Sequence, residues 1–155
     1  MKKRLVIRLL LAASILVAAP VRAQECKSRL QEFVNKTGYS IKVVAPCKVW
    51  VVQNALAIPL GADATGQLMI AQEGDTGIIG VAVESKARLK LTPEFLLRLA
   101  QKNDSLEHVK AGIDSDGDLF LRSELYIPGL TIEAFNFTLK KVVEASSDVY
   151  QMLKK

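Results

Sequence analysis

The chain has 155 residues, of which 50% are hydrophobic, and its 21 basic and 16 acidic side chains give a formal net charge of +5. Five of the basic residues lie within the first 23 positions, so the rest of the chain carries 16 charges of each sign and is neutral. A neutral body lacks the basic surface on which binding to nucleic acid or anionic lipid depends. We therefore expect neither kind of partner.

The first 23 residues have the pattern of a cleaved secretory signal. Basic residues at positions 2–4 precede an apolar run over 9–19, and Val21 and Ala23 place small side chains where a signal peptidase reads them. The apolar run is shorter than the ~20 residues that a membrane-spanning helix needs. We expect cleavage after Ala23, no transmembrane segment afterwards, and a periplasmic or secreted location in a bacterium.

The remaining residues, 24–155, are enough for one domain with a hydrophobic core. They contain two cysteines, Cys26 and Cys47. In an oxidising compartment such a pair most often forms a structural disulfide, and closing a loop of about twenty residues would stabilise the domain by about 3 kcal/mol. A redox or metal pair is disfavoured, because CxxC spacing is lacking and the chain has one histidine.

The first half of this domain is predicted to be a helix followed by strands. Apolar side chains recur with helical spacing up to Gly38, a natural left-handed helix end: Cys26, Leu30, Phe33 and Val34. Residues 39–53 are rich in β-branched and aromatic types and fit either one strand interrupted by a bend or two short strands. Residues 54–66 have no clean period. QLMIAQ and IIGVAVES then flank the turn EGDTG, as in a hairpin.

The second half begins with a well-marked helix, in which Thr92 is the expected N-cap, Pro93 the first helical residue and Glu94 a first-turn acid. This helix should end at Asn103-Asp104 and bury a stripe formed by Phe95, Leu96, Leu99 and Ala100. Two strands, LEHVKAGI and DLFLRSELY, follow. The last helix starts at Thr131 and presents a long apolar face: Ile132, Phe135, Leu139, Val142, Ser146, Val149 and Leu153.

The predicted order is α-β-β-β-α-β-β-α, with hairpins in place of βαβ crossovers. Runs of consecutive strands are typical of the α+β class. We therefore expect an antiparallel sheet with helices packed against it.

Three aspartates surround a glycine in IDSDGDLFLRSEL. Asp114, Asp116 and Asp118 suggest a calcium loop, but neither possible register of an EF-hand places Gly117 at position 6 together with an acid at positions 1 and 12. Asp-Gly between alternating apolar runs is instead a strong hairpin signal. We interpret the segment as a turn, with a weak cation site on the three aspartates as the alternative.

The single histidine, His108, is expected to face solvent from a strand. A catalytic base is the alternative, but no GxSxG or equivalent nucleophile motif accompanies it. Trp50 is expected to pack in the core or at an interface. We predict no catalytic residue, cofactor or resident metal.

From about Leu89 onward, three features are shared with a known family: the helix TPEFLLRLAQKND, the segment LEHVKAGIDSDGDLFLRSEL, and a Pro-Gly-Leu-Thr break before the long final helix. In these the chain resembles the YbjN family, labelled as bacterial sensory transduction regulators. The resemblance implies a fold similar to type III secretion chaperones, small α/β domains that often dimerise and bind extended segments of a client. It implies no active-site residues. The export signal and the cysteine pair depart from those cytosolic proteins.

We expect an exported, non-catalytic module that binds a protein or peptide, in an accessory, sensory or chaperone-like role, and that forms a homodimer if the resemblance holds. Binding would use an open sheet edge or an apolar surface. One alternative is a periplasmic sensor that responds to a small ligand or to a cation bound by the three aspartates. Another is an enzyme with a site around His108.

Overall fold

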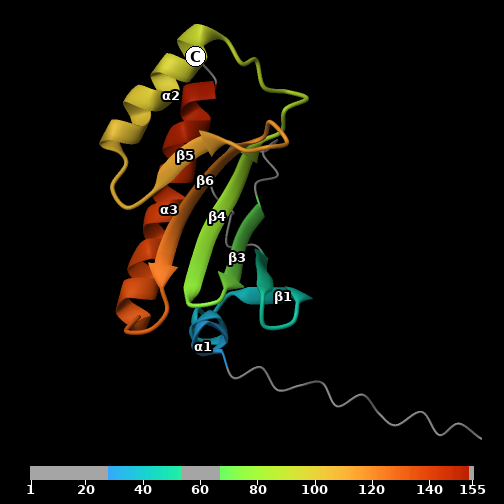
Figure 1. Cartoon of the computed structure of the whole chain (residues 1–155), viewed down its shortest axis with the longest axis vertical. Coiled ribbons are helices and arrows are strands. Elements are labelled where there is room, and N and C mark those ends of the chain that lie inside the picture. The colour runs from blue at the N-terminus through green and yellow to red at the C-terminus, as the bar shows by residue number, and fades with distance from the viewer. Residues whose placement is uncertain (1–27, 54–66, 154–155) are drawn as a thin grey trace, which may run out of the picture.

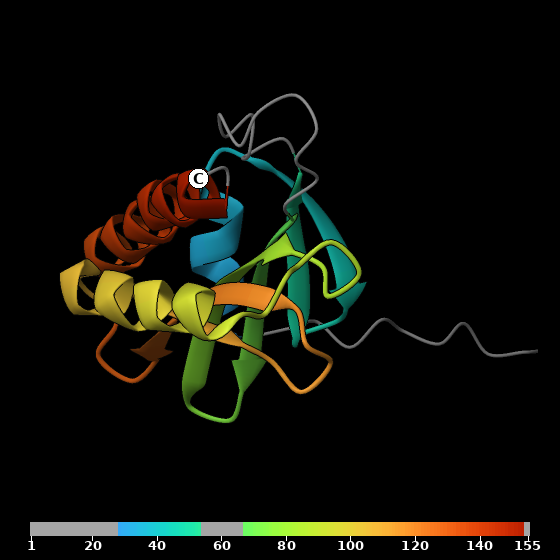
Figure 2. The same cartoon turned by 90° about the horizontal axis from the view of Figure 1, so that it is seen from above.

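The computed structural model describes residues 28–53 and 67–153. The signal segment, Cys26 and residues 54–66 lie outside this range. Within it, three helices lie on one face of a six-stranded sheet (Figures 1 and 2). The helices are α1 (Arg29–Lys36), α2 (Pro93–Ser105) and α3 (Ile132–Leu153).

Every neighbouring pair of strands is antiparallel, in the order β1-β2-β3-β4-β6-β5. The strands are β1 (Ser40–Ala45), β2 (Val49–Gln53), β3 (Gln67–Glu73), β4 (Thr76–Glu84), β5 (Lys110–Ile113) and β6 (Leu119–Tyr126). The predicted class, α+β with helices packed on an antiparallel sheet, is confirmed. Residues 39–53 form two strands, the second of the two alternatives, because the chain reverses through a turn in which Cys47 has a φ of +61°. The observed order, α-β-β-β-β-α-β-β-α, therefore has one strand more than the predicted order.

Buried side chains form rows across the inner face of the sheet, perpendicular to the strands. One row crosses five strands and is apolar throughout: Val52, Leu68, Val81, Leu121 and Ala111. The next row consists of Trp50, Ile70, Ile79 and Ser123. It therefore ends on a polar side chain, at a point on β6 that β5 does not reach.

The helices cover these rows. Phe135, Val142 and Val149 of α3 are fully buried, as the predicted stripe requires, whereas Ile132 and Leu153 at its ends are half-buried. Three side chains of α1 are buried, as expected: Leu30, Phe33 and Val34. Trp50 is buried in the core, as predicted, and its indole N–H donates to the Gln31 side chain of α1.

The predicted stripe of α2 is too wide. Phe95 and Leu99 are buried, but Leu96 is 46% exposed and Ala100 is exposed as well. The reason is position: α2 lies at the margin of the sheet, next to the short edge strand β5, so only one residue per turn faces the core (Figure 2). None of the helices in the described part of the chain is long and apolar enough to span a membrane.

Candidate functional site: an open strand edge beside a cavity

The aspartate segment forms the tight turn of the β5–β6 hairpin, as predicted. Asp114 accepts hydrogen bonds through Oδ1 from the backbone N–H groups of Asp116 and Asp118, both at 2.9 Å, and Gly117 has a φ of +90° that favours glycine. The Asp118 carboxylate accepts from the N–H of Lys86 at 2.7 Å. No group of three acidic, histidine or cysteine side chains converges as a metal site within residues 28–53 and 67–153. Cation binding at this turn stays the alternative interpretation.

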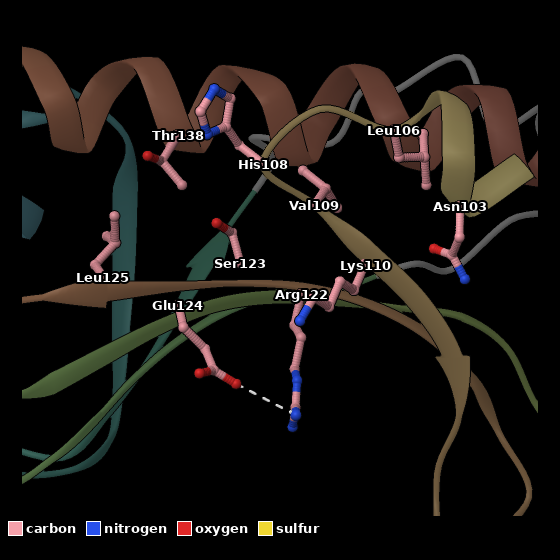
Figure 3. Close-up of a pocket in the computed structure, with 10 residues that line it drawn as sticks. All are labelled: Asn103, Leu106, His108, Val109, Lys110, Arg122, Ser123, Glu124, Leu125 and Thr138. Atoms are coloured by element: carbon pink, nitrogen blue, oxygen red, sulfur yellow. Dashed lines mark ion pairs between the residues drawn. The ribbon is translucent and has the colours of Figure 1, made fainter.

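His108 does not lie in a strand, contrary to the prediction. The predicted strand over 106–113 begins only at Lys110, and His108 sits in the preceding turn with a φ of +60°. The side chain is exposed, as expected, and its ring contacts Phe137 of α3 edge-on, with 5.6 Å between centroids. Figure 3 shows the ring turned away from the side chain of Ser123, the serine on the neighbouring strand β6. Among the described residues, no nucleophile–base pair is assembled around His108.

A cavity of about 690 Å³ lies beside β6 where this strand extends past the first residue of β5 (Figure 3). β5 has four residues and pairs with β6 only from Leu119 to Arg122, whereas β6 has eight residues and extends to Tyr126. The cavity is lined by side chains from α2, the turn before β5, β6 and α3: Asn103, Leu106, His108, Val109, Lys110, Arg122, Ser123, Glu124, Leu125 and Thr138. Successive residues of β6 alternate between the two faces of the sheet, so a cavity that touches four in a row must lie beside the strand edge.

Two observations show which backbone groups of β6 point toward this open side. The Asn103 side chain of α2 accepts from the N–H of Ala111 and donates to its C=O, both at 2.7 Å. Ala111 therefore bonds away from β6, and by antiparallel alternation its neighbour Lys110 exchanges hydrogen bonds with Arg122. The backbone N–H and C=O groups of the even-numbered residues of β6 thus point toward β5. Next to Glu124 and Tyr126 they point into an empty lane, which is the position that a longer β5 would occupy.

The hydrogen bonds on the opposite side of β6, toward β4, agree with this assignment. The N–H of Ile127 donates to the C=O of Asp75 at 2.8 Å, in line with the β4–β6 register. Odd-numbered residues of this strand therefore face β4. The backbone N–H and C=O groups of Glu124 and Tyr126 point to the open side, where no residue that the structure describes bonds them.

Ser123 marks the inner wall of the cavity. The residue is only 7% exposed, and its hydroxyl makes no hydrogen bond to any part of the described chain. No described side-chain nitrogen or oxygen is both enclosed and unpaired, so the Ser123 oxygen must be accessible from the cavity. The Thr138 hydroxyl on the facing helix, in contrast, already donates to the C=O of Ala134 at 2.9 Å.

The charged groups lie on the rim. Arg122 and Glu124 form an ion pair at 3.3 Å on the outer face of β6 (Figure 3), and Lys141 of α3 pairs with Glu107 at 3.3 Å outside the set of residues that line the cavity. Both pairs are partly or largely exposed, so each contributes little to stability. The inner wall carries no formal charge and is formed by Leu106, Val109, Ser123, Leu125 and Thr138.

The open edge was missed by sequence reasoning. No signal in the sequence points to it, because the predicted strand over 106–113 is long enough to cover β6. Continuing β5 back to position 106 would have paired every residue of β6.

Several solved structures have a fold similar to that of this chain. The crystal structure of YbjN from E. coli superposes with a TM-score of 0.58 at 20% identity, over 78% of this chain and 85% of that chain. A chain of the HopA1–SchA chaperone–effector complex gives 0.55 at 12% identity over 79% and 90%. The type III secretion chaperone SycH of Yersinia pestis, solved with a stable fragment of YscM2, gives 0.50 at 16% identity over 76% and 92%.

No family model and no curated protein matches the sequence. At these identities the likeness shows the fold, and the predicted type III secretion chaperone-like architecture is confirmed.

Proposed function

We propose that this protein is an exported, non-catalytic binding module that holds an extended segment of a protein partner against the open edge of β6. The proposal rests on the backbone groups of Glu124 and Tyr126, which lie beside a cavity and are bonded by no residue that the structure describes. An added strand would satisfy these groups and extend the sheet, which is a recurring mode of peptide recognition.

The edge strand at the other end of the sheet is less suited to this role. The register of β1 against β2 shifts between Val43 and Ala45. A bulge of this kind bends the strand and interrupts the row of groups that a partner strand would pair with. The open part of β6, in contrast, pairs with β4 in an unbroken register from Thr76 to Ala82.

The structural neighbours support the same class of function. One comes from a chaperone–effector complex, and SycH was solved with a fragment of YscM2, so domains of this shape occur in complexes with protein partners. Support for export comes from residues 1–23, and an intact mass that corresponds to a chain starting at Gln24 would test it.

The proposal is tested by a proline at an edge position. Glu124→Pro removes an N–H that points to the open side and leaves the pairing of β6 with β4 intact, and proline is tolerated at such positions. The matched control is Val43→Pro. Gln72 donates to Lys48, so even-numbered residues of β2 face β3, and Val43 consequently faces outward from the other sheet edge.

A phage-displayed library of linear random peptides would be selected on the purified exported protein. We expect selected peptides to bind wild type and Val43→Pro alike, and to bind Glu124→Pro about tenfold more weakly or worse, as loss of one or two hydrogen bonds requires. Equal binding to Glu124→Pro, or failure to enrich any peptide, would overturn the proposal. A thermal melt of each variant verifies that the fold is retained.

A further inference from the structure

We propose, on the basis of the function above, that the bound segment runs antiparallel to β6 and inserts one large apolar side chain into the cavity, opposite Leu125. The ligand class is thus an extended peptide with an apolar residue at one defined position. The geometry of the edge determines the direction of the bound segment, the face of the sheet to which each of its side chains projects, and the kind of side chain preferred.

The orientation follows from the lane that the ligand would occupy. β5 lies in this lane against Leu119–Arg122 and is antiparallel to β6. A ligand segment placed in line with β5, on the far side of Lys110, and running in the same direction as β5 lies opposite Glu124 and Tyr126. The Lys110–Arg122 pair is hydrogen-bonded, and such pairs recur at every second residue, so Glu124 and Tyr126 are the next two residues of β6 that can pair in this way. Each of these two residues can then exchange two hydrogen bonds with one ligand residue.

The facing of the ligand side chains follows from the pleat. Residues directly opposite each other in antiparallel strands project to the same face. The ligand residue opposite Leu125 therefore projects to the inner face, beside Ser123 and toward α3. The next ligand residue, opposite Glu124, projects to the outer face, near the Arg122–Glu124 ion pair.

Apart from the Ser123 hydroxyl, the inner wall presents apolar or already bonded groups, which favours an apolar side chain. Leu125 and Leu106 are half-buried and Val109 is buried, and the Thr138 hydroxyl is already bonded. A cavity of about 690 Å³ has room for a leucine or phenylalanine side chain. An acidic side chain would lose its hydration, and the cations that line the cavity, Lys110 and Arg122, belong to the outer face of the strands.

A partner's segment fits this edge better than a second copy of the domain does. The free stretch is short, because β5 covers β6 up to Arg122 and the turn containing His108 borders it. A second β6 would bring its own β5 and α2 into the same space, whereas a single extended segment brings nothing with it.

The test uses synthetic peptides and backbone amide shifts in ¹⁵N NMR spectra of the exported protein. The probes are acetylated and amidated heptapeptides with a lysine at each end, threonines between, and leucine, alanine or aspartate at the centre. We expect the leucine peptide to perturb the amides of Glu124 and Tyr126, the alanine peptide to bind about tenfold more weakly, and the aspartate peptide not to bind. Glu124→Pro should weaken binding of the leucine peptide about tenfold or more, and Val43→Pro should leave it unchanged.

N-methylation of the peptide reports its direction. In the antiparallel alignment the N–H of the central leucine points away from β6, so its methylation is tolerated, whereas methylation of the following residue removes a bond to Glu124 and abolishes binding. In a parallel alignment the leucine N–H would itself bond Glu124, and its methylation would abolish binding.

The outcomes separate the two proposals. Equal affinity for the three peptides, or loss of binding when the leucine is N-methylated, overturns this inference and leaves strand addition at the edge intact. If no peptide perturbs the edge amides and the phage selection also fails, both proposals fall. A stable dimer by sedimentation, with the Glu124 and Tyr126 amides protected from exchange in the free protein, would assign the edge to a second copy and overturn the inference.

Discussion

Asp114 and Asp116 belong to the same turn but differ in what their carboxylates contact. Asp114 accepts two backbone hydrogen bonds, whereas the Asp116 carboxylate accepts none from the described residues. We expect Asp114→Ala to lower the free energy of unfolding by about 1–2 kcal/mol, since it leaves two turn N–H groups without an acceptor. Asp116→Ala should change it by less than about 0.5 kcal/mol. Urea denaturation of the two variants measures the difference, and equal effects would contradict the contacts described.

The same turn allows a test of the cation-sensor alternative. Two of its three carboxylates already accept backbone hydrogen bonds, so we expect the Tm to be the same with and without millimolar calcium. An upward shift that Asp116→Ala removes would revive the sensor, because a bound ion stabilises the folded state by mass action.

Asn103 shields the outer edge of β5, because its amide pairs with both backbone groups of Ala111 as a neighbouring strand would. Replacing it by alanine leaves those two groups without their partner in a part-buried position. We expect Asn103→Ala to cost about 1–3 kcal/mol in urea denaturation. Gln101→Ala, an exposed position in the same helix, is the control and should be close to neutral. A neutral Asn103→Ala would mean that water replaces the amide without loss.

At the scale of elements, the start of α2 is the most completely specified. Thr92 accepts from the N–H of Phe95 at 3.1 Å, and Pro93 is the first helical residue, as predicted. The backbone N–H of Glu94, and next the Thr92 side chain, lower the pKa of the Glu94 carboxyl below its ordinary value of 4.5. A carboxyl with a lowered pKa in the folded state stabilises the fold above its ordinary pKa, and this contribution disappears as the pH falls through the lowered value.

We therefore expect Glu94→Gln to lower the Tm at neutral pH and to have little effect at pH about 2, where the wild-type carboxyl is also protonated. Thermal melts of both proteins across this range give the difference curve. Because Glu94 is fully exposed, the effect should be small and should shrink further in high salt. A difference that grows toward acid pH would contradict the assigned direction.

At the scale of the whole molecule, the predicted disulfide would join the segment before α1 to the β1–β2 turn. Cys47 lies in that turn, and Cys26 lies outside the described residues. We expect reduction, or the double replacement Cys26→Ser with Cys47→Ser, to lower the free energy of unfolding by about 3 kcal/mol. Denaturation with and without reductant measures this. Peptide mass spectrometry without reduction identifies the bond, and two alkylatable thiols in protein purified under oxidising conditions would show that it is absent.

Local patterns were sufficient to predict most elements of this fold. Four kinds of signal depend only on residues that are near in sequence, so the sequence alone reveals them. They are the cap at Thr92, the left-handed Gly38, the alternation in β3, β4 and β6, and the apolar face of α3. The width of the buried stripe of α2 could not be predicted in this way, because burial of Leu96 depends on how far the sheet extends beneath the helix.

Most elements, their class and the hairpin turn of the three aspartates follow from the sequence alone, since propensity, capping and period 2 or 3.6 are properties of neighbouring residues. The position at which β5 begins relative to β6 is visible only in three dimensions, and it leaves the edge open at Glu124 and Tyr126. That feature depends on how two strands of unequal length align and on a helix side chain, Asn103, that satisfies one of them. Such alignments are set by long-range packing, so a reading of adjacent residues does not contain them.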